Sequence, residues 1–115
     1  MASNGVGFIT WSIELLPDTQ AAALRRHVEV HSLAALKRDA RLREECAIEF
    51  ACQAALNDGN AYTVPEAIEL LTKGRTPHGV KLYTDALQLL RLRAAYLRFV
   101  DMAAWPEGRG DDEAT

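Results

Sequence analysis

Two histidines at helical spacing are the residues of this chain whose pattern comes closest to a chemical site. His27 and His31 are four positions apart, so on a helix both imidazoles share one face and could bind a single metal ion. The zincin motif would need Glu at position 28, where this chain has Val28. The simpler interpretation is a pair of partly exposed histidines beside a core stripe. We therefore expect no metal or other cofactor, with His27 and His31 kept as the metal-binding alternative.

The two cysteines favour packed thiols over catalysis or cross-linking. Cys46 and Cys52 are six positions apart, about 600° around a helix, so they point to different faces. Both lie among Ala, Ile and Phe, where burial raises the pKa of a thiol and suppresses its reactivity. The sequence also contains no phosphate-binding loop, dinucleotide fingerprint or Gly-x-Ser-x-Gly motif. These observations predict a protein that is not an enzyme.

One polar loop has the composition of a calcium site but the wrong register. With Gly59 of the sequence Asn57-Asp58-Gly59-Asn60 at the sixth position of a calcium loop, Ala54 falls at the first position and Pro65 at the twelfth. Neither side chain has a ligand oxygen, so the pattern does not predict calcium binding.

The elements that must position these residues are predicted to be helices. The chain has 115 residues, 49% of them hydrophobic and 25% charged, which suits one globular domain. Strong helix breakers are few, and the stretches between them are rich in Ala, Leu, Arg and Glu. We expect an all-α fold: a compact bundle of three to four helices over residues 18–106.

The boundaries of three helical segments follow from caps and breakers. Residues 18–56 could form one very long helix, or two if Ser32 caps a second one. Thr63-Val64-Pro65-Glu66 has the spacing of a capping box, and Gly74 should end that short helix. Thr76-Pro77 is predicted to open a long apolar C-terminal helix that reaches Ala104 or Trp105. Its wide apolar face is typical of a helix contacted from two sides or of one at a subunit interface.

Both ends of the chain are predicted to lie outside the bundle. Residues 1–17 are interpreted as an N-terminal arm that is a strand, a short helix or extended. Residues 107–115 contain no large apolar side chain and are interpreted as a disordered acidic tail.

The charged residues are arranged in blocks. Residues 44–72 carry six carboxylates and no Lys or Arg, whereas residues 73–98 carry six Lys or Arg and one Asp. The two blocks could pack against each other, the basic block could bind an external anion, or the acidic block could bind a basic partner. The sequence favours the first interpretation and leaves the other two open.

Residues 62–71 also resemble the opening helix of excisionase-type helix-turn-helix domains, which share a Thr-Val-x-Glu-Ala-x-x-Leu-Leu pattern. The resemblance covers about ten residues and implies a short turn and a second short helix, with Arg75, His78 and Lys81 facing DNA. The chain departs from that pattern where Gly74-Arg75-Thr76-Pro77 leads toward a long helix.

These patterns lead to two functional hypotheses. The first is a non-enzymatic, cytoplasmic interaction protein (an adaptor, assembly subunit or inhibitor) that uses a helical face, binds another protein or forms a homodimer, and does not enter a membrane. Its contact residues would be Arg93, Trp11, Phe99 and Trp105. Arg93 falls within the apolar arc of the last helix, where it must snorkel, pair with a carboxylate or serve a partner. The alternative is a nucleic-acid-binding regulator or subunit that uses Lys73, Arg75, Lys81, Arg91 and Arg98.

Overall fold

The computed structural model describes residues 12–77 and 83–105, and within them every regular element is a helix. In chain order these are η1 (Ile13–Leu15, a 3-10 turn), α1 (Asp18–His31), α2 (Leu33–Arg38), α3 (Ala40–Asn57), α4 (Val64–Lys73) and α5 (Tyr83–Met102). The all-α class is confirmed. The expected number of three to four helices is wrong, because the described residues form five α-helices.

The segment predicted as one or two helices is broken twice. Ser32 has a positive φ of 78°, and its hydroxyl accepts a hydrogen bond from the backbone N–H of Ala35. Asp39 then caps α3, because its Oδ1 accepts from the N–H groups of Arg41 and Leu42 at 3.0 and 3.1 Å. Side chains of this type compete with helical continuation by binding backbone donors. The break at Asp39 was not predicted, and it produces the short helix α2.

The start and end of α4 follow the local sequence signals. Thr63 accepts from the N–H of Glu66, and the Glu66 carboxylate accepts from the N–H of Thr63, which completes a capping box. Gly74 ends the helix in the left-handed conformation with φ of 71°.

The predicted opening of the last helix at Thr76 and Pro77 is not observed. Thr76 and Pro77 are not helical, and α5 is described from Tyr83, after five residues that lie outside the described part. It ends at Met102, short of Ala104 and Trp105. The proline therefore does not mark the first turn of a continuous helix. In the described residues α4 is likewise not followed by the short second helix that the excisionase-type resemblance implied.

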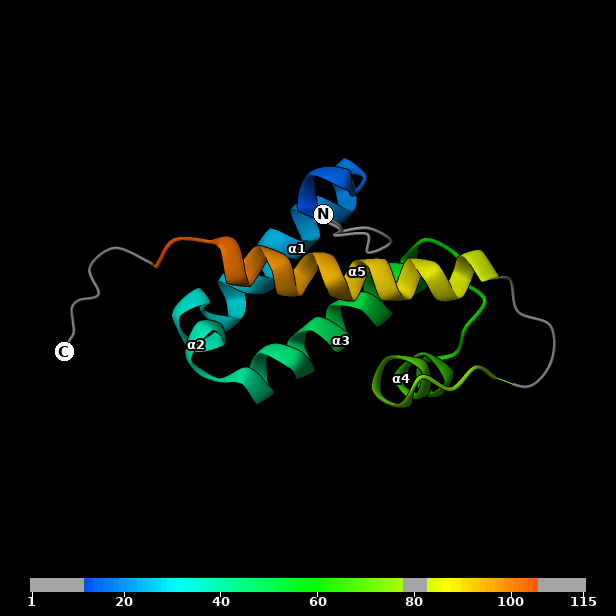
Figure 1. Cartoon of the computed structure of the whole chain (residues 1–115). Helices are drawn as coiled ribbons and strands as arrows, with labels where there is room; N and C mark the ends of the chain where they lie inside the picture. The colour runs from blue at the N-terminus through cyan, green and yellow to red at the C-terminus, as the bar shows by residue number, and fades with distance from the viewer. Residues whose placement is uncertain (1–11, 78–82, 106–115) are drawn as a thin grey trace, which may run out of the picture.

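The core lies mainly between α3 and α5, which run side by side through the middle of the molecule (Figure 1). Four buried alanines of α3 let the two helices approach closely: Ala47, Ala51, Ala54 and Ala55. They belong to the same buried cluster as the fully buried Leu89, Leu92 and Tyr96 of α5. α2 lies near the C-terminal end of α5, where Lys37 donates to the backbone oxygen of Asp101, and α4 lies near its start.

The described end of the N-terminal arm belongs to this core. Ile13 and Leu16 are buried against α1 and α5. Residues 1–11 and 106–115, which include Trp11 and the predicted tail, lie outside the described part. Among the described helices, none combines the length and hydropathy needed to span a bilayer.

Candidate functional site

α3 carries two concave features that share the carboxylates Glu45 and Glu49. One is an apolar groove between α3 and α4, and the other is a polar cleft beside α1 that contains His31 and Cys46. Both features are lined by these two acids because positions 45 and 49 are one turn apart on the exposed side of α3. The two features therefore form one continuous candidate surface.

The groove between α3 and α4 has a volume of about 370 Å³. Ile48, Cys52 and Leu56 form a stripe along α3 at intervals of one turn, and Val64 and Ile68 of α4 form the opposite wall. Leu56, Val64 and Ile68 remain more than two-fifths exposed. The capping box at Thr63 fixes where α4 starts, so it also fixes the position of Val64 beside α3.

The cleft beside α1 is lined by His31, which contacts His27 one turn earlier on the same helix. Their rings stack with centroids 4.4 Å apart, as the four-residue spacing predicted for a shared face. The His31 Nδ1–H donates to the backbone oxygen of His27 at 3.0 Å, which leaves the His31 Nε2 facing Glu49 Oε1 at 4.0 Å. The His27 Nε2–H donates to the same Glu49 oxygen at 2.9 Å. One carboxylate of α3 thus faces both rings of α1.

Cys46 joins these histidines from the neighbouring helix. The ligand atoms of His27, His31 and Cys46 all lie within 4.8 Å of one another. Burial raises the pKa of the Cys46 thiol, and a hydrogen bond with Tyr96 partly opposes that shift. The Tyr96 hydroxyl also lies 2.8 Å from His27 Nδ1. Three helices therefore contribute to one polar cluster at the edge of the core.

Sequence reasoning found only half of this cluster. The pairing of His27 with His31 is visible because it depends on local spacing along one helix. Cys46 and Glu49 lie on another helix and join the histidines only after α2 has turned the chain. The sequence did contain one indication: Cys46 and Glu49 are three residues apart, which places both side chains on the same side of a helix. The other thiol, Cys52, is buried on the groove side, where desolvation raises its pKa.

The predicted partner-binding residues are dispersed over the molecule. Arg93 Nε donates to Glu44 Oε2 at 2.6 Å, which is one of the three outcomes foreseen for a cation in the apolar arc. Phe99 packs against the core, while Trp105 is half-exposed with Lys37 and Arg38 near its ring. Trp11 lies outside the described residues.

The predicted nucleic-acid-binding residues also fall into separate places. Lys73 and Arg75 both pair with Glu69 at the end of α4. Arg91 and Arg98 line two different cavities beside η1. Lys81 lies in the gap between the two described ranges, as does His78. Within those ranges, no described cavity brings the basic residues of both helices together.

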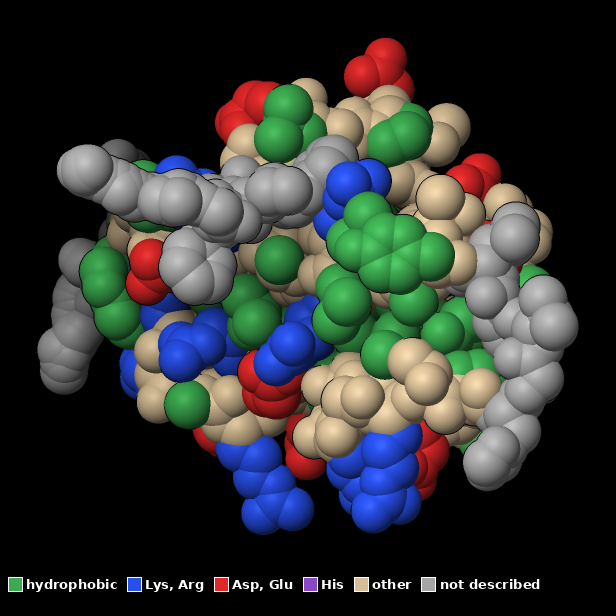
Figure 2. Space-filling model, turned by 45° about the vertical axis from the view of Figure 1, so that its right-hand side comes forward, with side chains coloured by type: hydrophobic (Ala, Val, Ile, Leu, Met, Phe, Trp, Pro, Cys, Tyr) green, Lys and Arg blue, Asp and Glu red, His purple; other side chains and the backbone are tan. Residues whose placement is uncertain are grey.

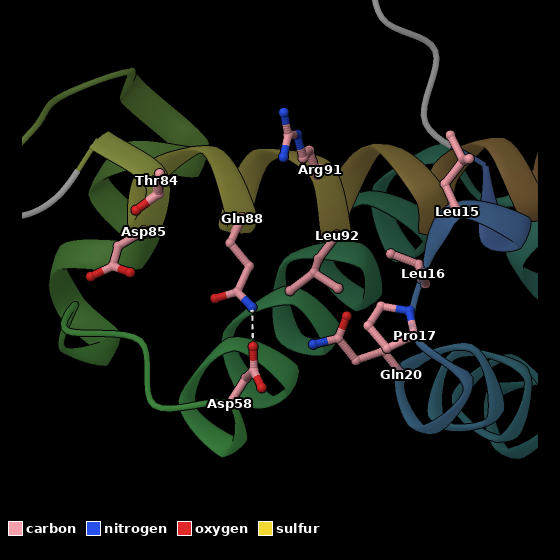
Figure 3. Close-up of a pocket in the computed structure, with 10 residues that line it drawn as sticks. All are labelled: Leu15, Leu16, Pro17, Gln20, Asp58, Thr84, Asp85, Gln88, Arg91 and Leu92. Atoms are coloured by element: carbon pink, nitrogen blue, oxygen red, sulfur yellow. Dashed lines mark hydrogen bonds between the residues drawn. The ribbon is translucent and has the colours of Figure 1, made fainter.

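The carboxylates beside the cavity that Arg91 lines already have hydrogen-bond partners within the protein. Figure 3 shows Gln88 reaching from α5 toward Asp58, and its Nε2 donates to the Asp58 carboxylate at 2.7 Å. Arg91 points away from that contact. Asp85 Oδ2 accepts from the backbone N–H of Ala61. The polar loop at residues 57–60 is therefore bound to α5, and both nearby acids have protein partners.

Comparison of the chain with protein-family models, with curated proteins and with solved structures finds no match. The groove and the polar cluster are the features of the described residues that bear on function. The groove can accept apolar side chains next to two carboxylates, and the cluster offers nitrogen, sulfur and oxygen donors.

Proposed function

We propose that this chain is a non-enzymatic, cytoplasmic interaction protein that binds a basic amphipathic helix of a partner protein in the groove between α3 and α4. The observation that carries the proposal is the exposed apolar lining of that groove beside Glu45 and Glu49. An adaptor, an assembly subunit and an inhibitor would all use such a surface in the same way.

The dimensions of the groove support a helical occupant. The stripe from Ile48 to Leu56 covers nine residues, a rise of about 12 Å along the α3 axis. A partner helix of about three turns would present apolar side chains at intervals of three and four residues over that length. Val64 and Ile68 on the opposite wall would contact the same face of the partner.

The charge at the groove supports a basic partner. Its described lining contains two carboxylates and no Lys or Arg. Glu45 pairs with Arg41, but both side chains are more than three-fifths exposed, and such pairs contribute little. Lys or Arg residues flanking the apolar face of a partner helix would face these acids and would speed the encounter.

Figure 2 shows one face of the molecule on which apolar side chains are exposed. Hydrophobic side chains gather across its middle, with Lys, Arg, Asp and Glu side chains around and below them. Apolar surface bordered by charged residues is typical of interaction sites. A second copy of this chain is the competing occupant, because a homodimer would cover the same apolar side chains.

The proposal is tested with a designed peptide as probe. Its helix would carry Leu at positions 1, 4, 5 and 8 and Lys on both flanks, and a matched peptide would carry Glu in place of Lys. Binding is measured by fluorescence anisotropy. We expect the Lys peptide to bind, and Ile68→Glu and Glu45→Lys each to weaken binding at least about tenfold.

Val30→Glu is the control, because Val30 is 73% exposed on α1 and does not line the groove. Equal affinity for the Lys and Glu peptides, or no effect of Ile68→Glu, would contradict the proposal. A mass measurement of the free protein in solution decides whether a second copy covers the groove instead.

A further inference from the structure

We propose that His27, His31 and Cys46, with Glu49 as the fourth ligand, bind one Zn²⁺ ion that links α1 to α3. This site goes beyond the proposed docking function and does not depend on it. It rests on the donor atoms, their separations and the hydrogen bonds that orient them.

The donor set selects a transition metal of the zinc type. Two imidazole nitrogens, one thiolate and one carboxylate oxygen are ligands that Zn²⁺ uses in four-coordinate protein sites. Ca²⁺ and Mg²⁺ prefer sites made only of oxygen, so a cluster with nitrogen and sulfur excludes them as natural occupants. Four protein ligands would leave no open position, which is typical of a structural rather than a catalytic metal site.

The separations require only a small adjustment. The donor atoms of His27, His31 and Cys46 lie within 4.8 Å of one another. Zn–N bonds of about 2.1 Å and Zn–S bonds of about 2.3 Å place tetrahedral donors roughly 3.5 Å apart. Contraction of these three donors by about 1 Å would satisfy the ion, whereas Glu49 lies outside this group and would have to turn toward it. Glu49 is already within 2.9 and 4.0 Å of the two Nε2 atoms, and its side chain is half-exposed and able to turn.

The hydrogen bonds around the cluster orient its ligands. His31 gives its Nδ1–H to the His27 carbonyl, so its Nε2 lone pair is available to a metal. Tyr96 lies behind His27 at 2.8 Å from Nδ1. When a metal takes the Nε2 of His27, the ring proton moves to Nδ1 and is donated to the Tyr96 oxygen. The same tyrosine hydroxyl can then donate to the Cys46 sulfur, with which it already interacts.

Outer contacts of this kind hold metal ligands in orientation in other proteins. Here one buried tyrosine of α5 would support two ligands from two other helices. All four proposed ligands and the tyrosine that supports them are described residues. A bound metal would stabilise the contact among α1, α3 and α5.

The test begins with protein treated with a chelator and then titrated with Zn²⁺ in competition with a chromophoric chelator. We expect one Zn²⁺ per chain and a higher melting temperature with Zn²⁺ bound. Titration with Co²⁺ should give the visible bands of a tetrahedral ion and a near-ultraviolet band from thiolate-to-metal charge transfer.

Four variants assign the ligands. His31→Gln changes a partly exposed side chain and should weaken Zn²⁺ binding more than about 100-fold, since loss of even an outer partner costs roughly 10–100-fold. Cys46→Ser should abolish the charge-transfer band. Cys52→Ser, at the other buried thiol, and Val30→Glu, on the same helix as the histidines, should leave binding unchanged.

Binding of less than one Zn²⁺ per chain at micromolar concentrations would overturn the proposal. So would an octahedral Co²⁺ spectrum without a thiolate band, or Zn²⁺ affinity that is unchanged in His31→Gln. If Cys46→Ser does not fold, the Co²⁺ spectrum of the unmodified chain and the His31→Gln affinity decide the question.

Discussion

His27 of α1 and Tyr96 of α5 are joined by a hydrogen bond of 2.8 Å between Nδ1 and the phenol oxygen. The tyrosine is fully buried, and burial raises the pKa of its hydroxyl, which therefore stays protonated as a donor. Its ring also packs against Phe50 of α3. The contact thus anchors a polar residue of one helix to the core formed by the other two.

Tyr96→Phe should destabilise the protein by about 1–2 kcal/mol, because it removes a buried partner of the imidazole without opening a large cavity. Urea unfolding measures the change. The same variant should bind Zn²⁺ roughly 10–100-fold more weakly. Tyr83→Phe is the matched control, since the Tyr83 side chain is exposed on the same helix. Equal stability of the two variants would show that the hydrogen bond contributes nothing.

Arg93 and Glu44 should show a coupling energy of about 0.5–1 kcal/mol in a double-mutant cycle with Arg93→Met and Glu44→Gln. The pair is short and charge-assisted, at 2.6 Å, but 30–40% exposure allows water to screen it. Raising the salt concentration to about 1 M should reduce the coupling. If Arg93 instead contributes only to binding a partner protein, Arg93→Met will leave the free energy of unfolding unchanged.

Asn60→Ala should cost about 2–3 kcal/mol, measured by thermal and urea unfolding. Its amide donates to the Asp85 backbone oxygen and to Gln88 Oε1, and its carbonyl oxygen accepts from the N–H of Tyr62, each at 2.9 Å. Removing the side chain leaves buried polar groups without partners. Asn57→Ala, at an exposed residue before the same turn, should change stability by less than about 0.5 kcal/mol. A comparable cost for both variants would refute this role.

Nucleic-acid binding remains the alternative functional prediction, and a salt titration separates it from partner docking. Because Lys73 and Arg75 lie apart from Arg91 and Arg98, we expect no saturable binding of a duplex of about 20 base pairs in about 50 mM salt. Binding that weakens steeply with salt would support the alternative, if the slope of log affinity against log salt concentration corresponds to several neutralised phosphates. In that case Arg98→Gln should reduce the slope by about one.

The features that sequence reasoning predicted depend on local chemistry. The helical class, the capping box at Thr63 and the left-handed end at Gly74 each follow from a few neighbouring residues. Ser32 was foreseen as a cap for the same reason. Asp39 was missed because a capping side chain between two good helix-forming segments competes closely with continuation of the helix. Pro77 was predicted to lie in the first turn of the last helix but is not helical, since proline suits both a first helical turn and a loop.

The candidate site could be predicted only in part, because it depends on contacts between helices. The spacing of His27 and His31 indicated a shared face, but the approach of Cys46 and Glu49 requires the turn through α2. The acidic block was predicted chiefly to pack against the basic block, with a basic partner left open as an alternative. Its apolar neighbour, the groove formed with Val64 and Ile68, exists only because α4 packs against α3.

Site-specific crosslinking in the native cell shows whether a basic helix of a partner protein occupies the groove between α3 and α4. A photoreactive side chain replaces Ile68 in the groove, and the same side chain at Val30 is the control. The crosslinked peptide is then identified by mass spectrometry. We expect an adduct at position 68, absent at position 30, whose partner segment is a helix with one apolar face and flanking Lys or Arg. No adduct specific to position 68, or an adduct with a second copy of this chain, would contradict it.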